Sequence, residues 1–268
     1  MFVIPAPTPV AFNLFGLPIY WYGIIMAFAI FIGMLVGNKV FNIVNADSRR
    51  DIIIEYAPMI IISGILGARL YFCMLNPGYY FSHPLEILDI REGGLSIHGA
   101  IIFGILSIIF MAKKTKVFLL SILDGMACAV LCGQVIGRWG NYFNSEAYGL
   151  PVKSQNWGLL IPEANRAAGY TDFNLFHPAF LYESSLNLAG FIFLLFIMLK
   201  FGKKYKGLTF FIYLIIYAVI RFFIEQIRID SALNLGNIPI AEVVSIILFI
   251  IGLVGVLFVL CRSFSDKK

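Results

Sequence analysis

A stretch of thirteen residues, from Gly137 to Gly149, places charged and amide side chains directly after a long apolar run. Its polar members are one cation, one carboxylate and two amides: Arg138, Glu146, Asn141 and Asn144. A loop in water has no need of such polarity against a membrane-spanning segment, whereas a site that binds a charged group at the edge of the hydrocarbon does. The pattern therefore points to recognition of a lipid headgroup.

Arg221 lies inside another apolar segment, where an ionisable side chain costs at least about 2.5–3.5 kcal/mol. Fourteen residues of helix from Gly207 put it roughly 21 Å along the segment and roughly 10 Å short of the far surface of the hydrocarbon. Glu225 and Arg228 follow on the same helical face, so a local ion clamp is one explanation. Such a clamp of two arginines and one glutamate leaves one positive charge uncompensated. Because guanidinium groups stay charged and match phosphate geometry, Arg138 and Arg221 are the candidate phosphate ligands.

His98 opens a third apolar segment, with Gly93 and Gly94 before it and Gly99 directly after it. These glycines indicate a tight turn that delivers the imidazole to a membrane interface. A single interfacial histidine is often only a hydrogen-bonded bystander. Because an imidazole exchanges protons near neutral pH, His98 is nevertheless the candidate general base.

Other polar residues in or beside apolar segments have simpler explanations. Tyr20, Trp21 and Tyr22 open the first segment in the manner of an interfacial aromatic belt. Arg69 lies inside a further segment and Asp124 inside the apolar run before Arg138, and a buried pair between them explains their presence as well as a function does.

The composition requires a membrane protein. Hydrophobic residues make up 60% of the chain and charged residues 13%, against roughly 25% charged residues in a soluble domain. The apolar runs are about 16–22 residues long, as membrane-spanning helices require, and lack the short alternation of a β-barrel. We predict an all-α integral membrane protein, a single domain over residues 1–268 with seven transmembrane helices. The predicted spans are residues 19–38, 52–73, 97–112, 117–137, 179–199, 207–226 and 240–261.

The basic residues alternate between the two sides of these spans. One side carries 13 of the 20 lysines and arginines. They are Lys39, Arg49, Arg50, Lys113, Lys114, Lys116, Lys200, Lys203, Lys204, Lys206, Arg262, Lys267 and Lys268. The positive-inside rule places this side in the cytoplasm. The N-terminus is then outside, the C-terminus is cytoplasmic, and Gly137–Gly149 faces outwards.

Residues 138–178, between the fourth and fifth predicted helices, are rich in Asn, Gly, Pro and aromatic residues, and we expect a small extracytoplasmic head there. The four cysteines, Cys73, Cys128, Cys132 and Cys261, lie in or at the end of apolar runs. No histidine or carboxylate pattern completes a metal site around them, so we predict neither a metal nor a disulfide framework. The net charge of +5 follows from the topology and requires no nucleic-acid partner.

Taken together, these motifs resemble those of the bacterial prolipoprotein diacylglyceryl transferases. The resemblance rests on Trp21-Tyr22-Gly23, Gly93–Gly99, Gly137–Gly149, His177-Pro178 with Tyr182-Glu183, and Arg221–Arg228. The motifs occur in the family's order and cover essentially the whole chain. Trp139 departs from the pattern, where a smaller aliphatic residue is expected, and this changes packing rather than chemistry.

The resemblance implies seven transmembrane helices in the bacterial cytoplasmic membrane, with an active site toward the outer leaflet. It implies transfer of the diacylglyceryl group of phosphatidylglycerol to the thiol of the lipobox cysteine in a prolipoprotein signal peptide. A thioether forms, glycerol phosphate leaves, and neither a metal nor an organic cofactor is implied. The partners are therefore phosphatidylglycerol, the prolipoprotein and the bilayer.

Each candidate residue has a hypothetical role in that reaction. His98 would take the thiol proton, because the thiolate is the nucleophile, and Arg138 and Arg221 would stabilise the departing phosphate. The remaining candidates would bind substrate or hold the arginines. Asn141, Asn144 and Gly149 would shape the headgroup pocket, Glu146 and Glu225 would hold the arginines, and Tyr22 and Arg228 would contact substrate.

Three other classes of protein could use some of these features. An anion transporter would need a polar path to the cytoplasmic side, where the spans are mainly Leu, Ile and Phe. A non-catalytic lipid-binding scaffold would need the arginines but not His98. An intramembrane protease would need a Ser/Lys, paired-Asp or HExxH arrangement within the spans, which the sequence lacks.

Overall fold

The structure is a computed structural model that describes residues 2–48, 50–89, 93–154, 156–229, 234–235 and 238–265. Three basic residues named above, Arg49, Lys267 and Lys268, lie outside the described residues.

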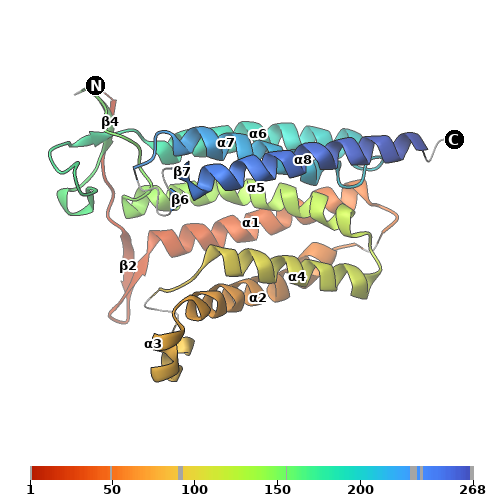
Figure 1. Cartoon of the computed structure of the whole chain (residues 1–268), viewed down its shortest axis with the longest axis horizontal. Coiled ribbons are helices and arrows are strands. Elements are labelled where there is room, and N and C mark those ends of the chain that lie inside the picture. The colour runs from red at the N-terminus through yellow and green to blue at the C-terminus, as the bar shows by residue number, and fades with distance from the viewer. Residues whose placement is uncertain are drawn as a thin grey trace.

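Within the described residues, seven long helices run side by side, as predicted (Figure 1). They are α1 (Trp21–Val44), α2 (Ile52–Leu75), α4 (Ile97–Thr115), α5 (Leu119–Asn144), α6 (Ala179–Phe201), α7 (Leu208–Glu225) and α8 (Ile240–Ser265). All seven are long and apolar enough to cross a membrane. α5 continues seven residues beyond the predicted end of the fourth span at residue 137, so the first part of the expected head insert is helical.

α1 and α5 form the centre of the bundle because small residues let their backbones approach closely. A Cβ at Gly33 would lie 2.5 Å from the carbonyl oxygen of Ala129, and one at Gly37 would lie 2.7 Å from that of Gly125. Figure 1 shows α2 and α4 on one side of α1, with α5 to α8 on the other. One apolar core joins α1 and α5 to α2 and α4, and a second joins them to α6 and α7.

The strands and short helices gather at one end of the bundle, which we call the sheet end (Figure 1). β1 (Phe2–Ile4), β4 (Trp157–Leu160) and β5 (Leu175–Phe176) form a sheet in which β1 pairs with β4 in parallel and β5 with β4 antiparallel. β2 (Val10–Leu14) and β3 (Leu17–Tyr20) form a hairpin, and β6 (Asn234–Leu235) pairs with β7 (Ile238–Pro239). The short helices are α3 (Pro77–Ser82), η1 (Pro84–Leu88) and η2 (Glu163–Asn165).

The opposite end, which we call the basic end, carries the lysines that follow α4 and α6. Here the chain turns from α1 into α2 around Asp51. Its Oδ1 accepts hydrogen bonds from the side chains of Asn38 and Asn42, both at 2.8 Å. Since these bonds favour the ionised carboxylate, they lower the pKa of Asp51.

Candidate active site

Arg138 lies within α5, six residues before the end of that helix, rather than at the helix end as predicted. Its Nη2 is 2.6 Å from Oε1 of Glu183, a buried carboxylate on α6. Its Nη1 donates to Oδ1 of Asn141 at 3.5 Å. The side chain is 23% exposed, so the guanidinium is anchored on two sides and still accessible.

A polar chain extends from Arg138 through Asn141. Asn141 Nδ2 donates to Oε1 of Glu146 at 3.0 Å. Glu146 therefore reaches Arg138 through Asn141, and the direct carboxylate is Glu183, which corrects the expectation that Glu146 itself holds the arginine. Tyr22 lies beside these residues, because its ring packs on Gly140. Its hydroxyl is close enough to Glu146 and Arg138 to interact electrostatically with both.

Arg221 has the partner that the sequence predicts. Its Nη2 lies 2.6 Å from Oε2 of Glu225, one turn further along α7. The Glu225 side chain is 2% exposed and that of Arg221 is 17% exposed. The carboxylate is thus enclosed, while part of the guanidinium remains open to a ligand.

Asp124 sets the two arginines at the same depth. This buried residue of α5 accepts the backbone N–H of Gly207 at 2.6 Å and that of Phe210 at 2.8 Å, which fixes the start of α7 against α5. Arg138 lies fourteen residues after Asp124, and Arg221 lies fourteen residues after Gly207. At 1.5 Å per residue, each is about 21 Å from this shared anchor.

The two arginines also lie on stripes of their helices that border one apolar core. At about 100° per residue, Leu131 and Arg138 share one face of α5, and Phe210 and Arg221 share one face of α7. Leu131 is buried in an apolar core against which Phe210 packs, so both stripes begin at this core.

α6 packs against both α5 and α7. A Cβ at Gly190 would lie 2.7 Å from Ile216 on α7 and 3.7 Å from Leu131 on α5. Glu183 is two turns away on the same face of α6, next to Ser184, whose hydroxyl donates to the carbonyl of Val135 at 2.8 Å. The sequence identifies Glu183 only as part of a family motif and not as a site residue, although an ionisable residue within a predicted span is itself a signal.

His98 lies on α4, which is on the other side of α1 from the helices that carry the arginines. It is exposed in the first turn of α4, and its ring lies 6.1 Å from that of Tyr71 on α2. The next residue, Gly99, is pressed against the carbonyl of Gly67, so a side chain there would collide with the α2 backbone. At the sheet end, the α2–α4 pair and the α5–α7 pair lie on opposite sides of α1 (Figure 1).

Asn144, Gly149 and Arg228 link the helices to the strands. Asn144 is the last residue of α5, and its carbonyl accepts the side chain of Asn165 at 3.5 Å. Gly149 donates its N–H to the carbonyl of His177 at 2.9 Å and forms a β-bridge with Arg228. This bridge holds the residues after α5 next to those after α7.

Arg69 and Asp124 do not form the buried pair considered from sequence. Arg69 donates to the carbonyls of Glu86, Ile87, Gly93 and Gly94, and so folds the loop before His98 onto α2. Asp124 instead binds the first turn of α7. Each is satisfied by backbone groups far along the chain.

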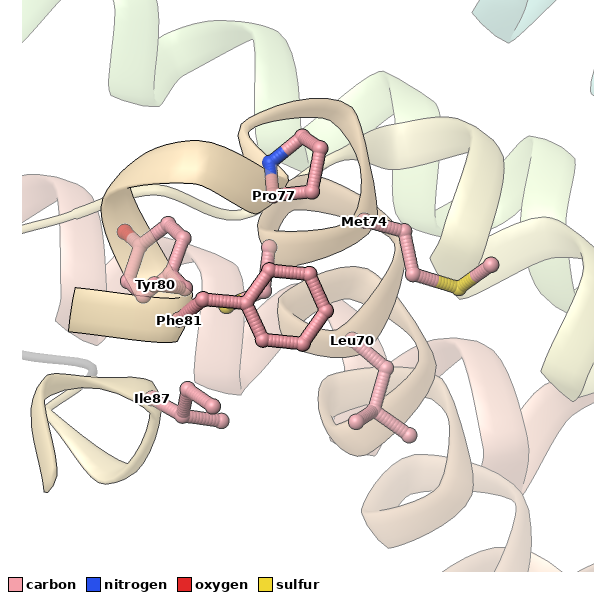
Figure 2. Close-up of a pocket in the computed structure, with 7 residues that line it drawn as sticks. Leu70, Met74, Pro77, Tyr80, Phe81 and Ile87 are labelled. Atoms are coloured by element: carbon pink, nitrogen blue, oxygen red, sulfur yellow. The ribbon is translucent and has the colours of Figure 1, made fainter. Parts of the chain in front are cut away.

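An open cleft of about 400 Å³ lies between α2, α3 and η1 (Figure 2). Its lining is apolar: Leu70, Cys73, Met74, Pro77, Tyr80, Phe81 and Ile87. Since none of these side chains carries a charge, the cleft suits hydrocarbon and not a phosphate group.

Comparison with known proteins gives one consistent result. Residues 9–258 match the sequence model of the prolipoprotein diacylglyceryl transferase family. The chain is 40% identical to the phosphatidylglycerol–prolipoprotein diacylglyceryl transferase of Acaryochloris marina, over 99% of this chain and 96% of that protein. It is 40% identical to the protein of the same name from Clostridium novyi, over 92% of this chain and 94% of the relative. For the Staphylococcus aureus protein of that name the identity is 38%, over 91% of this chain and 86% of the relative.

Proposed function

Because the chain belongs to the prolipoprotein diacylglyceryl transferase family, it transfers a diacylglyceryl group from phosphatidylglycerol to prolipoproteins, and we propose that Arg138 and Arg221 jointly hold the lipid phosphate during this transfer. The observation that supports the proposal is their equal distance along α5 and α7 from the shared anchor at Asp124, on stripes that border one apolar core. The phosphate lies in the outer leaflet of the bacterial cytoplasmic membrane, since the sheet end faces outwards in our topology.

The proposed reaction builds up negative charge on the phosphate. The thiolate of the lipobox cysteine attacks the carbon of the diacylglyceryl group that is bonded to the phosphate oxygen. A C–S bond forms, the C–O bond breaks, and glycerol phosphate leaves with the bonding electrons. Negative charge thus grows on the phosphate, where preorganised cations lower the barrier most. Glu183 and Glu225 orient the two guanidinium groups, and Tyr22 and Asn141 complete the headgroup pocket.

His98 remains the candidate for removing the thiol proton. It is exposed at the sheet end, where a peptide can reach it, but its ring packs against α2 rather than either arginine. The signal peptide would therefore lie across the sheet end of α1, with its cysteine between His98 and the lipid.

The transporter alternative is disfavoured by the core beneath the arginines. An anion that passed from Arg138 to the basic end would have to cross the junction of α5, α6 and α7. Buried Cys128, Leu131, Leu194 and Met198 fill that junction. A scaffold without activity is distinguished by the assay below.

The direct test is to incubate the purified chain with phosphatidylglycerol and a lipobox peptide. We expect the peptide to gain the mass of one diacylglyceryl group while glycerol phosphate is released in equal amount. A peptide with serine in place of the lipobox cysteine is the control and should gain no mass. Tight lipid binding without any mass gain would contradict the proposal and favour the scaffold.

A further inference from the structure

Gln134 and Tyr213 form a polar pair in the apolar interface between α5 and α7. Nε2 of Gln134 donates to the hydroxyl oxygen of Tyr213 at 3.2 Å. The other amide atom of Gln134, Oε1, is buried and has no hydrogen-bond partner within the described part of the chain. A buried polar atom without a partner is destabilising by about 1–3 kcal/mol, so this atom requires an explanation.

The amide can be turned over without changing its shape. In the alternative orientation the Tyr213 hydroxyl donates to Oε1 of Gln134, and Nε2 takes the place of the unpartnered oxygen. The pair then presents the two N–H donors of the Gln134 amide. The group that would satisfy them is a hydrogen-bond acceptor supplied from outside the protein.

The depth of the pair suggests which acceptor this is. Gln134 lies one helical turn before Arg138, on the same face of α5, and is therefore about 6 Å deeper in the membrane. Tyr213 lies eight residues before Arg221 on α7, and its hydroxyl meets Gln134 across the interface with α5. The polar zone of one leaflet is only about 5–7 Å thick, so a lipid whose phosphate contacts the arginines has its ester groups at this deeper level.

We propose that the Gln134–Tyr213 pair binds an ester carbonyl of the diacylglyceryl group whose phosphate contacts Arg138 and Arg221. This subsite rests on the proposed phosphate site. An ester carbonyl is an acceptor without a donor, which matches the N–H donors that the pair presents. Holding the lipid at both the phosphate and the ester fixes the glycerol carbon between them, where the thiolate attacks.

The test compares two lipids that differ only at this group: phosphatidylglycerol and its dialkyl ether analogue, which lacks both ester carbonyls. The wild-type protein should use the diester with about a three- to tenfold lower KM, the effect of one neutral hydrogen bond. Gln134→Met keeps the length of the side chain but removes the donor, and Tyr213→Phe removes the hydroxyl that orients the amide. Both variants should use the two lipids with nearly equal KM.

Tyr56→Phe is the matched control, because Tyr56 is a buried tyrosine in the other apolar core and should leave the wild-type preference unchanged. Turnover of the ether lipid shows whether each variant is folded. The wild-type preference in either folded variant, or no preference in the wild type, overturns the ester subsite. Failure of the phosphate site has a different signature, namely normal use of both lipids after replacement of Arg138 or Arg221 by lysine.

Discussion

At the residue scale, Arg138 and Arg221 each contact one carboxylate and still have N–H donors available for a ligand. A guanidinium has five N–H donors, and the contacts to Glu183 and Asn141 engage two of those of Arg138. The remaining donors can bind phosphate oxygens in a bidentate arrangement. The carboxylates therefore serve to orient the cations as well as to compensate their charge in a poorly hydrated region.

The first prediction is that Arg138→Lys and Arg221→Lys each lower kcat/KM about a hundredfold or more. Lysine keeps the positive charge but offers a point charge in place of a planar fork, so bidentate contact with the phosphate is lost. The rate of peptide mass gain at several phosphatidylglycerol concentrations measures the effect. Arg166→Lys is the control, because Arg166 binds backbone carbonyls of Ile161 and Thr171 at the sheet end. Near-normal turnover in both test variants would remove the phosphate site.

The second prediction concerns His98. Glutamine fills a similar volume but cannot accept a proton, so His98→Gln should abolish transfer while lipid binding persists. His83→Gln, at an exposed loop histidine, is the control and should keep the wild-type rate of transfer. Retained transfer by His98→Gln would clear His98 of this role.

The sequence predicts one of the two carboxylate partners and not the other. Glu225 is one helical turn from Arg221, so spacing alone pairs them. Glu183 reaches Arg138 from another helix, 45 residues further along the chain. The spacing of residues within a helix carries no information about a contact between two helices. The sequence therefore predicts the nearer glutamate, Glu146, as the partner of Arg138.

At the element scale, Asp124 is the residue that fixes α7 against α5. The third prediction is that Asp124→Ala destabilises the protein by about 2–3 kcal/mol, because two buried backbone N–H groups lose the carboxyl group that accepts their hydrogen bonds. Thermal unfolding of the purified protein in detergent should show a lower midpoint, with a smaller loss for Asp124→Asn, which keeps one acceptor oxygen. Asp172→Ala is the control at an exposed turn. An unchanged midpoint in Asp124→Ala would contradict the anchoring role.

The amino-acid sequence predicts the presence of the helices more reliably than the residues at which they end. Hydropathy identifies all seven because each must cover about 30 Å of hydrocarbon with apolar side chains. It places the end of α5 too early, since the polar residues from Arg138 onward lower the hydropathy while the backbone stays helical to Asn144. The parallel pairing of β1 with β4 joins segments more than 150 residues apart, and nothing local in either strand predicts it.

At the scale of the whole molecule, the structure separates two tasks on either side of α1. α5, α6 and α7 carry both arginines and their carboxylates, whereas α4 carries His98 and the apolar cleft lies between α2, α3 and η1. α5, α7 and α2 end at the sheet end, and α4 begins there (Figure 1). A lipid on one side and a peptide on the other would then meet across α1, and this arrangement depends on which side of the membrane the sheet end faces.

The fourth prediction tests that orientation. In a Cys261→Ser background, which leaves three buried cysteines, single cysteines are placed at Phe15 in the exposed β2–β3 turn and at Lys203 at the basic end. In right-side-out membrane vesicles, a maleimide that cannot cross the membrane should label the Phe15→Cys protein directly. It should label the Lys203→Cys protein only after the vesicles are opened. The physical reason is the excess of lysine and arginine at the basic end, which favours retention in the cytoplasm.

The reverse labelling pattern would put Arg138 and Arg221 at the cytoplasmic leaflet. The helix packing and the depth match between the arginines would be unaffected, because neither depends on orientation. The proposed meeting of lipid and signal peptide at the outer surface would then fail, even if purified protein still transferred the diacylglyceryl group in detergent. Labelling and the transfer assay therefore test separate parts of the account, the direction of the site and its chemistry.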